Sequence, residues 1–400
     1  MFRLTIAALA LCGTAPVFAE THTVSPGEGA QERLQEALIL AEPGDEIVLE
    51  AGRYELTDGL SLDIDGVIVR GSGMEDTILD FTQQAGSGEG LLVTSDNVTL
   101  RDFAMENPKG DGIKSKGADN IVYTQIKVTW TNGPDPSNGA YAIYPVESTG
   151  VLVDGVIVSG ASDAGIYVGQ SSKITVRNSI AENNVAGIEI ENSRDALVEH
   201  NIARLNTGGI LVFDLPGLPV MGGGNVVVRE NLVAGNTTPN FAPPGNIVAG
   251  VKRGTGIMVM ANENVMVTRN VVSENPTAAF MVVAYTQAFD DERYNPYPRN
   301  VVIGENVADD VGDEPDFEGG EQLVQAFGGS LPPLLWDGLS DSDGMPAVAV
   351  TDGTAGWTLG LTEQGQGIES AQPAPFQAPD AGIEWDMSSV GAPAELEERL

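Results

Sequence analysis

Short apolar runs alternate with polar turns through most of the chain, from about residue 45 to residue 306. The runs are rich in Val and Ile, as in Val226-Val-Val228, and are separated by Asn and Gly. Runs this short and β-branched, with Asn and Gly between them, predict strands joined by tight turns.

The same pattern recurs along the chain. A polar or glycine residue ends one apolar run in each unit, and three of the seven spacings between these residues are 23 positions, while the others are longer. The residues are Asp102, Gln125, Gly155, Asn178, Asn201, Asn231, Asn270 and Asn306. In four units a second asparagine follows five residues later, at Asn183, Asn206, Asn236 and Asn275. A unit of roughly 22 to 24 residues fits one coil of three short strands, so the repeat predicts an all-β fold of stacked coils, a parallel β-helix. Asparagine at these turns tolerates left-handed φ and can bond along the stack.

A second strand in each unit begins with a small residue followed by Ile, and we call this strand set the Gly-Ile face. Alternation along the strands predicts these inward side chains: Ile113, Ile143, Ile166, Val168, Ile188, Ile190, Ile210, Val212, Ile257 and Val259. The predicted outward side chains are Lys114, Lys116, Tyr144, Tyr167, Glu189, Glu191, Leu211, Phe213, Met258 and Met260. The small residues at positions 112, 142, 165, 187, 209 and 256 either flatten this face for a ligand or allow tight packing at the bend.

The two ends of the chain differ from the repeat. Residues 1–19 have the basic start, apolar run and small final residues of a secretory signal peptide, and they contain the only cysteine, Cys12. Residues 20–308 form the predicted β-helix domain, in which the helical spacing of Leu34, Ala37 and Leu38 predicts a capping helix over Ala30–Leu40. Residues 309–400 are acidic and rich in Pro and Gly, which indicates a cap or tail. No later apolar run is long enough to span a membrane, so we expect a periplasmic or secreted product.

The charge restricts the partners. A formal net charge of -37 argues against nucleic acid, whose phosphates need a basic surface. Neutral or cationic partners remain, as does a purely solubilising role for the acidic surface.

Two stretches carry a resemblance to a known fold family. The helix Ala30–Leu40, followed by GDEIVLEAGRY and VIVRGSG, resembles the entry of right-handed parallel β-helix proteins of the pectin lyase-like superfamily. The repeats from Val98 to Asn306 resemble those of periplasmic carbohydrate-binding proteins and sugar hydrolases. More narrowly, segments such as GASDAGIYVGQS and GGILVFDLPGLP are similar to a family of exported bacterial β-helix proteins. This resemblance implies fold and export, and no particular activity.

The sequence departs from the enzymes of this fold. Polygalacturonases carry a set of aspartates and a Gly-His-Gly on neighbouring coils, where this chain offers Tyr, Glu and Leu. The Asp-Pro-His-Asp motif of alginate epimerases is absent, and His200 lies beside a turn asparagine. The sequence therefore leaves open whether the protein is an enzyme.

Candidate chemistry gathers on the Gly-Ile face. Insertions at residues 132–138 and 237–253 precede this strand and insertions at 214–224 and 286–299 follow it, so we expect them to frame a cleft. Tyr144 and Tyr167 should stack, with Tyr141 close by, and aromatic faces suit sugar rings. Lys114 and Lys116 could neutralise the carboxylate of a uronic acid in a lyase or epimerase, with Tyr144 or Tyr167 completing the proton transfer.

Carboxylates offer a hydrolytic alternative. Hydrolysis of a glycoside needs two of them roughly 5 to 9.5 Å apart, and the candidates are Asp163, Glu189, Glu191 and Asp214. The tyrosines could instead only stabilise the sheet, and the lysines could be solvated or paired with Glu189 and Glu191.

No cofactor is predicted. Residues Trp336 to Gly344 resemble a calcium loop, but Leu339 and Val350 occupy positions that need oxygen ligands.

Two hypotheses follow. The first is a protein that binds or acts on a polysaccharide or oligosaccharide in a cleft over the Gly-Ile face. The second is a non-catalytic exported module that docks a protein partner through an exposed apolar patch of Leu211, Phe213, Met258 and Met260.

Overall fold

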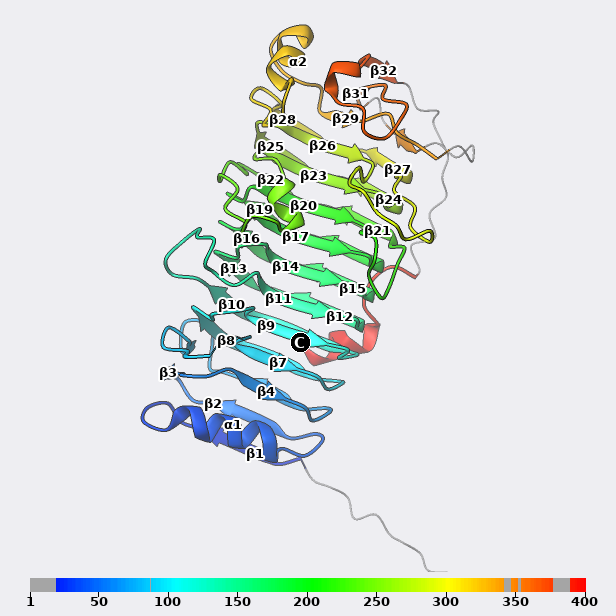
Figure 1. Ribbon diagram of the computed structural model, residues 1–400. Helices are drawn as coiled ribbons and strands as arrows, with labels where there is room; N and C mark the ends of the chain where they lie inside the picture. The colour runs from blue at the N-terminus through cyan, green and yellow to red at the C-terminus, as the bar shows by residue number, and fades with distance from the viewer. Residues whose placement is uncertain (1–18, 87, 342–346, 352–353, 377–388) are drawn as a thin grey trace, which may run out of the picture.

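The protein is a long stack of coils built from short parallel strands (Figure 1). The computed structural model describes residues 19–86, 88–341, 347–351, 354–376 and 389–400. Each coil contributes one strand to each of three stacks, and a loop or bend joins one strand to the next. The predicted right-handed parallel β-helix is confirmed.

The first stack is the Gly-Ile face and forms a sheet of 12 strands. Its parallel strands are β4 (Leu60–Leu62), β7 (Leu91–Val93), β9 (Ile113–Lys116), β11 (Tyr141–Val146), β14 (Ala164–Gly169), β17 (Ala186–Glu191), β20 (Gly208–Phe213), β23 (Thr255–Met260), β26 (Ala278–Val283), β29 (Leu334–Trp336) and β31 (Gly356–Thr358). The antiparallel β32 (Ala374–Phe376) closes its C-terminal edge.

The other two stacks are joined into one sheet by the long strands β8 (Thr99–Glu106) and β10 (Ile121–Thr129), which run through both. The second stack also holds β1 (Thr21–Val24), β2 (Glu46–Leu49), β5 (Ile68–Arg70), β12 (Thr149–Asp154), β15 (Ser172–Arg177), β18 (Arg194–Glu199), β21 (Gly224–Arg229), β24 (Glu263–Thr268), β27 (Arg299–Gly304) and β30 (Val348–Val350). The third holds β3 (Gly52–Glu55), β6 (Thr77–Asp80), β13 (Ile157–Ser159), β16 (Ile180–Glu182), β19 (Ile202–Arg204), β22 (Leu232–Ala234), β25 (Val271–Asn275) and β28 (Val307–Val311).

The core fills the inside of the coils and follows strand alternation. All of the predicted inward side chains of the Gly-Ile face are buried, from Ile113 in β9 to Val259 in β23. Parallel pairing in register places equal positions of successive coils on top of one another, as with Ile166, Ile188 and Ile210. The stack is therefore held together by columns of branched apolar side chains.

The bend between the second and third stacks corrects the predicted alignment. Left-handed φ occurs at Asp102 (60°) and Asn178 (52°) as expected, but in the later coils it lies one residue before the asparagine, at His200, Glu230, Arg269 and Glu305. The predicted alignment of the coils is therefore wrong by one residue after Asn178, because it matched polar residue types and not the positions of the bends. In that coil Ser179 takes the place that Asn201 takes in the next, and its backbone N–H donates to the Asn201 side chain (3.0 Å).

The aligned asparagines form two buried ladders inside the bends. In one, the Asn201, Asn231 and Asn270 amides each donate to the side-chain oxygen of the next coil, ending at Asn306 (2.9–3.1 Å). In the other, the same contacts join Asn184, Asn206, Asn236 and Asn275 (3.0–3.1 Å). The first member is Asn184 and not the predicted Asn183, which has the left-handed φ at this bend. Each amide is thereby donor and acceptor at once, so its burial leaves no polar group unpaired.

The glycines of the Gly-Ile strands pack against the bends. A Cβ on Gly209 would lie 2.4 Å from Val233 Cγ1, and one on Gly112 would lie 2.8 Å from Val128 Cγ1. Both valines belong to the core. Two roles were predicted for these small residues. The structure supports tight packing at the bend and not a face flattened for a ligand.

The two ends of the stack are covered. The helix α1 (Ala30–Leu40) has the predicted bounds and buries Ala30, Leu34 and Leu38 over the first coil. At the other end, stacking continues past residue 309 through β29, β30 and β31, and α2 (Gly320–Phe327) and the short helix η2 (Ile368–Ser370) pack there (Figure 1). None of the helices in the described ranges is long and apolar enough to cross a membrane.

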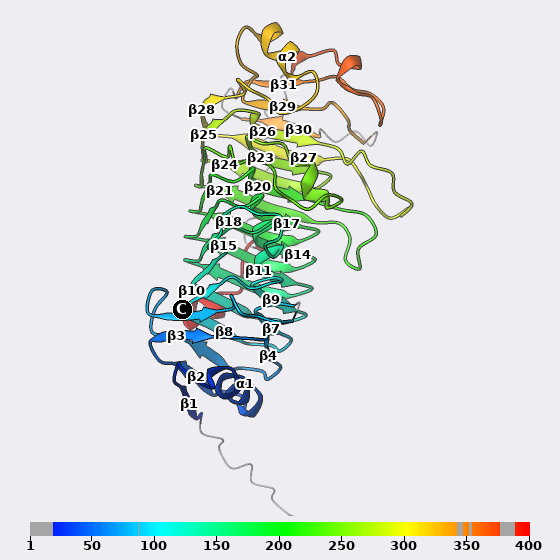
Figure 2. The same cartoon turned by 60° about the vertical axis from the view of Figure 1, so that its left-hand side comes forward.

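The last ten residues return to the middle of the stack, as Figures 1 and 2 both show. The short helix η4 (Ala394–Arg399) packs Leu396 against Val122 and Leu152. Arg399 donates to Thr99 Oγ1 (2.7 Å) and to the Asn120 carbonyl (2.7 Å). We call residues 391–400 the C-terminal clamp.

Candidate functional site

Outward side chains of the Gly-Ile face change in chemical class along the stack. Strand register aligns one column that runs from lysine through tyrosine and glutamate to apolar residues, namely Lys114, Tyr144, Tyr167, Glu189, Leu211, Met258 and Met281. Because the coils are in register, these side chains lie in this order on the surface of one sheet. The face therefore has a basic, an aromatic, an acidic and an apolar zone.

The aromatic zone is a cluster of three tyrosines. The Tyr144 and Tyr167 rings meet edge to face with centroids 4.9 Å apart, and Tyr141 lies 4.5 Å from each. The predicted association of these rings is thus present. Burial raises the pKa of the Tyr144 hydroxyl to about 12, and it also raises the pKa values of Tyr141 and Tyr167. All three hydroxyls therefore stay protonated at neutral pH and can donate hydrogen bonds.

The basic zone is smaller than the sequence indicates, because its lysines are paired. Lys114 Nζ lies 3.3 Å from Glu89 and 3.8 Å from Asp111, and it sits over the Tyr144 ring at 4.7 Å from the centroid. Lys116 lies 3.8 Å from Glu147. The suggested partners Glu189 and Glu191 were wrong, since these glutamates lie three coils further along the stack.

Three carboxylates, Asp163, Glu189 and Glu191, form the acidic zone. Burial raises the pKa of Asp163 to about 7, although a hydrogen bond from Tyr141 acts to lower it. Burial likewise raises the pKa of Glu191 to about 7, although a hydrogen bond from Tyr167 acts to lower it. Burial and the charge of Asp163 also raise the pKa of Glu189, to which no hydrogen bond contributes. Asp163 and Glu191 thus exchange protons near neutral pH, as general acids and bases do.

Asp214 makes several structural hydrogen bonds at the edge of the apolar zone. Its carboxylate accepts hydrogen bonds from the Gly223 backbone (2.7 Å) and the Asn262 amide (2.8 Å), and its carbonyl accepts one from the Tyr294 hydroxyl (2.7 Å). Burial raises its pKa to about 6. Asp214 therefore anchors the insertions at residues 214–224 and 286–299 to the coil below them.

The insertions fold over the apolar zone and cover it. Leu211 is 1% exposed and Phe213 is 6% exposed, while Met258 and Met260 are half-buried. They pack with Val248 and Val251 of the insertion that contains the short helix η1 (Ile247–Gly250). The exposed apolar patch predicted from strand alternation is therefore wrong, because alternation says nothing of the loops above a strand.

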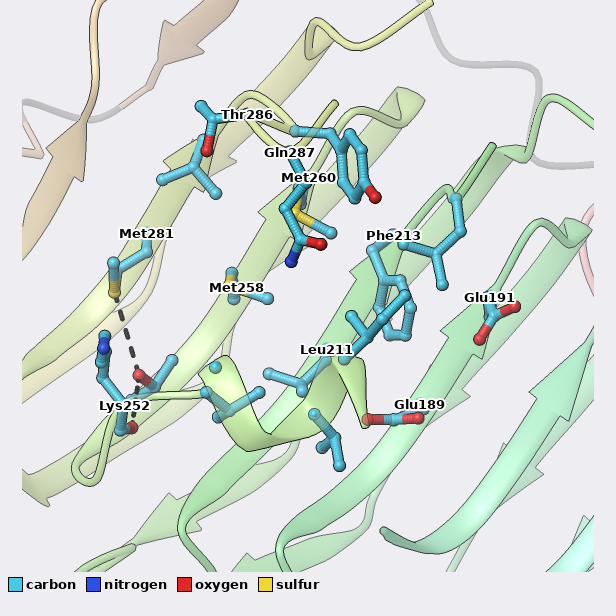
Figure 3. Close-up of a pocket in the computed structure, with 18 of the residues that line it drawn as sticks. Glu189, Glu191, Leu211, Phe213, Lys252, Met258, Met260, Met281, Thr286 and Gln287 are labelled. Atoms are coloured by element: carbon cyan, nitrogen blue, oxygen red, sulfur yellow. Dashed lines mark hydrogen bonds between the residues drawn. The ribbon is translucent and has the colours of Figure 1, made fainter. Parts of the chain in front are cut away.

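A cavity of about 620 Å³ remains between these loops and the strands. Figure 3 shows Glu189 and Glu191 at one end of it and the three methionines Met258, Met260 and Met281 toward the other. Its rim includes the exposed residues Asn246, Ile247, Lys252, Thr286 and Gln287. The walls are mostly apolar, and three carboxylates, those of Asp163, Glu189 and Glu191, line one end.

The sequence did not single out several residues of this site. Asp111 borders the tyrosines, with its pKa raised by burial to about 6, and Asp337 lies in the cavity wall, where the Ala284 N–H donates to it (2.6 Å). Tyr285 lines the cavity and meets Tyr294 edge to face, with centroids 5.5 Å apart. The insertion at residues 286–299 indicated that a loop borders this part of the Gly-Ile face. Its sequence did not indicate which of its aromatic residues point toward the cavity.

Two places were considered for a metal ion. Glu199, His200 and Glu230 bring possible ligand atoms within 4.8 Å of one another at an outer bend. Arg229 already pairs with Glu199 (2.6 Å) and Arg269 with Glu230 (2.8 Å). In the calcium-like stretch, residues 342–346 lie outside the described ranges and Leu339 is buried among apolar side chains.

Comparisons with known proteins concern the fold. A family model described as a right-handed beta helix region matches residues 65–215. The A-module of the mannuronan C-5 epimerase AlgE4 from Azotobacter vinelandii superposes with a TM-score of 0.53 at 14% identity, covering 83% of this chain and 94% of that one. An exopolygalacturonase from Thermotoga maritima gives 0.54 at 11% identity, with 87% and 90% covered. No curated protein sequence matches the chain.

These findings define the class. The chain has the right-handed parallel β-helix fold that the sequence resemblance implied. At 11–14% identity, the similarity extends to the fold and not to the reaction.

Proposed function

We propose that this protein is exported and binds or acts on a carbohydrate polymer laid across the Gly-Ile face, with the tyrosine cluster as its main contact. The observation that carries the proposal is the cluster itself, in which Tyr141 and Tyr144 are half-buried beside an acidic zone. Aromatic rings bind the apolar faces of sugars, and their hydroxyls bond to sugar oxygens. Proteins of this fold that act on polysaccharides, such as those compared above, support the same substrate class.

The acidic zone supplies groups for acid–base chemistry at the end of this surface. Asp163 and Glu191 have pKa values near 7 and each touches a tyrosine hydroxyl. A carboxylic acid that is still protonated near neutral pH can donate its proton to the leaving oxygen of a glycoside, and an ionised neighbour can act as base or nucleophile. We therefore propose hydrolysis as the reaction class if the protein turns its substrate over.

A lyase or epimerase mechanism is less well supported. It needs a cation to stabilise the charge that develops on a uronic acid. Lys114 is already balanced by Glu89 and Asp111, and the acidic zone would repel a second carboxylate. The geometry favours a neutral glycan.

A screen of the mature protein against neutral and acidic glycans tests the proposal, with Tyr144→Ala as the diagnostic variant. We expect binding of a neutral glycan that weakens at least about ten-fold in Tyr144→Ala, since a lost aromatic contact accounts for about 1.4 kcal/mol or more. Absence of both binding and turnover on every glycan would refute it. Export is tested separately by N-terminal sequencing of the mature protein, which should begin near Glu20.

Docking of a protein partner has less support. That hypothesis rested on exposure of Leu211, Phe213, Met258 and Met260, of which the first two are buried and the methionines are half-buried beneath the insertions.

A further inference from the structure

The cavity over the apolar zone combines features that a polysaccharide does not need. Beyond the acidic end, its walls are formed by Leu211, Phe213, Met258, Met260, Met281 and Val283. The volume of about 620 Å³ lies within the roughly 300–1,000 Å³ of small-molecule sites. Sugar hydroxyls would lose their hydrogen bonds to water against such walls, whereas an alkyl or aryl group would gain from leaving water.

Most of the carboxylates of the cavity lie at one end. Asp163, Glu189 and Glu191 line that end, and the lysine among the lining residues, Lys252, lies at the exposed rim. Asp337, elsewhere in the wall, already accepts hydrogen bonds from the backbone N–H groups of Ala284 and Leu339. Asp163 and Glu191 each have a tyrosine hydroxyl as partner. The acidic end thus lacks a cation of its own within the described lining.

Glu189 is the key group. Its side chain is 2% exposed and lines the cavity, and no hydrogen bond or ion pair stabilises its charge within the described part of the chain. A buried carboxylate without a partner is costly, and the cost is removed when an opposite charge arrives beside it. Figure 3 shows its carboxylate at the end of the space that the apolar side chains enclose.

We infer that this cavity binds a small organic cation with an apolar body, whose ammonium group lies against Glu189 between Asp163 and Glu191. The Tyr141 ring borders the same end and offers a cation–π contact. The apolar body extends past Phe213 toward the methionines, whose flexible side chains adapt to its shape. This site goes beyond the proposed function, because its ligand is recognised by charge and apolar surface and not as a sugar.

Three probes that share one body provide the test. 4-Phenylbutylamine, 4-phenylbutan-1-ol and 4-phenylbutyrate are titrated into the full-length mature protein by calorimetry at pH 8, up to millimolar concentration. We expect the amine to bind at least about ten-fold more tightly than the alcohol, because only the amine can pair with the carboxylates. The anion should give no binding signal. Equal affinity for amine and alcohol, or no binding of the amine, would overturn the inference.

Two variants that each remove one carboxylate charge test whether Glu189 is the group that contacts the amine. Glu189→Gln keeps the shape and removes the charge, so it should weaken amine binding at least about ten-fold while leaving the alcohol unchanged. Glu182→Gln makes the same change on the third stack, where Glu182 pairs with Arg204, and should leave amine binding as in the wild type. Unchanged amine binding in Glu189→Gln would also refute the site.

Two further measurements distinguish the loss of one contact from misfolding of a variant. Unfolding curves establish that both variants fold, and Met260→Ala, which alters only the apolar wall, should weaken the amine and the alcohol alike. Glycan binding is measured on the same proteins. Tyr144 is not among the residues that line the cavity, so Tyr144→Ala should lose glycan binding and keep amine binding, which separates this site from the tyrosine surface.

Discussion

Buried polar side chains occur in two regions of this β-helix, and the two differ in how those side chains are satisfied. At the bends, asparagines from successive coils each donate to one neighbour and accept from another. On the Gly-Ile face, the clustered carboxylates of Asp163, Glu189 and Glu191 can only accept when they are ionised, so the charge of one opposes ionisation of the others. Amides at the bends therefore form a structural ladder, whereas carboxyl groups on the Gly-Ile face form a candidate binding site.

The largest expected effect comes from breaking the ladder. Asn231→Ala removes a side chain that accepts from the Asn201 backbone and amide and donates to the Val198 carbonyl and to Asn270. Several buried groups lose their partners at once, so we expect the free energy of unfolding to fall by about 4 kcal/mol. Urea denaturation measures this. A loss under about 1 kcal/mol would mean that water replaces the amide and that the ladder is not a major source of stability.

The carboxylates should respond to pH in a way that the ladder does not. Burial raises the pKa of Glu191 from 4.5 to about 7, so the folded protein holds this proton at a higher pH than the unfolded chain does. The free energy of unfolding therefore falls as pH rises from about 4.5 to about 7, by up to about 3 kcal/mol for this group.

Glu191→Gln should lose that part of the pH dependence. The comparison of interest is the difference between wild type and variant in urea denaturation at pH 5 and pH 8, because the other acidic groups titrate in both. Parallel stability profiles for the two proteins would show that Glu191 is solvated and that its pKa is ordinary.

A glycine substitution distinguishes packing at the bend from a role in the cavity. A Cβ on Gly209 would meet Val233 Cγ1 at 2.4 Å and the Gly256 carbonyl oxygen at 2.5 Å, so Gly209→Ala should lower the free energy of unfolding by about 2 kcal/mol. Gly250→Ala is the matched control at the cavity rim, where a Cβ has no atom within 4 Å. If Gly209→Ala changed ligand binding without changing stability, the flattened-face role would be restored.

The smallest expected effect is a gain at the bend. Leu205 has a φ of 56° and is 44% exposed, and this left-handed conformation is unfavourable for a leucine. Leu205→Asn should raise the free energy of unfolding by about 1 kcal/mol, because asparagine tolerates left-handed φ. Leu232→Asn, at a similarly exposed strand position, should bring no such gain, and thermal unfolding of both variants checks the contrast.

The sequence predicted what depends on local pattern. Strand alternation identified the inward residues of the Gly-Ile face, and helical spacing identified α1 with its bounds. The association of Tyr144 with Tyr167 followed from the coil register. Each of these rests on the geometry of a strand or helix alone, which the residues themselves specify.

What the sequence could not provide depends on contacts between distant segments. Leu211 and Phe213 point outward as predicted, but insertions from other coils bury them. Lys114 pairs with Glu89 and Asp111, because these carboxylates lie on the preceding coil and on its own coil, whereas Glu189 and Glu191 lie three coils away. The predicted alignment became wrong at Asn201 because asparagine suits both the left-handed bend position and the buried position after it. Only the backbone conformation distinguishes the two positions.

The C-terminal clamp changes how this stack can come apart. In a solenoid each coil touches only its neighbours, so unfolding can begin at either end and spread coil by coil. Here residues 391–400 bond to Thr99, Asn120, Thr175 and Asp195, which span the coils from β8 to β18. These contacts join residues up to 300 positions apart, and they need the coils from β8 to β18 to be in place. The middle of the molecule should therefore melt as one cooperative block, released by the detachment of a ten-residue segment.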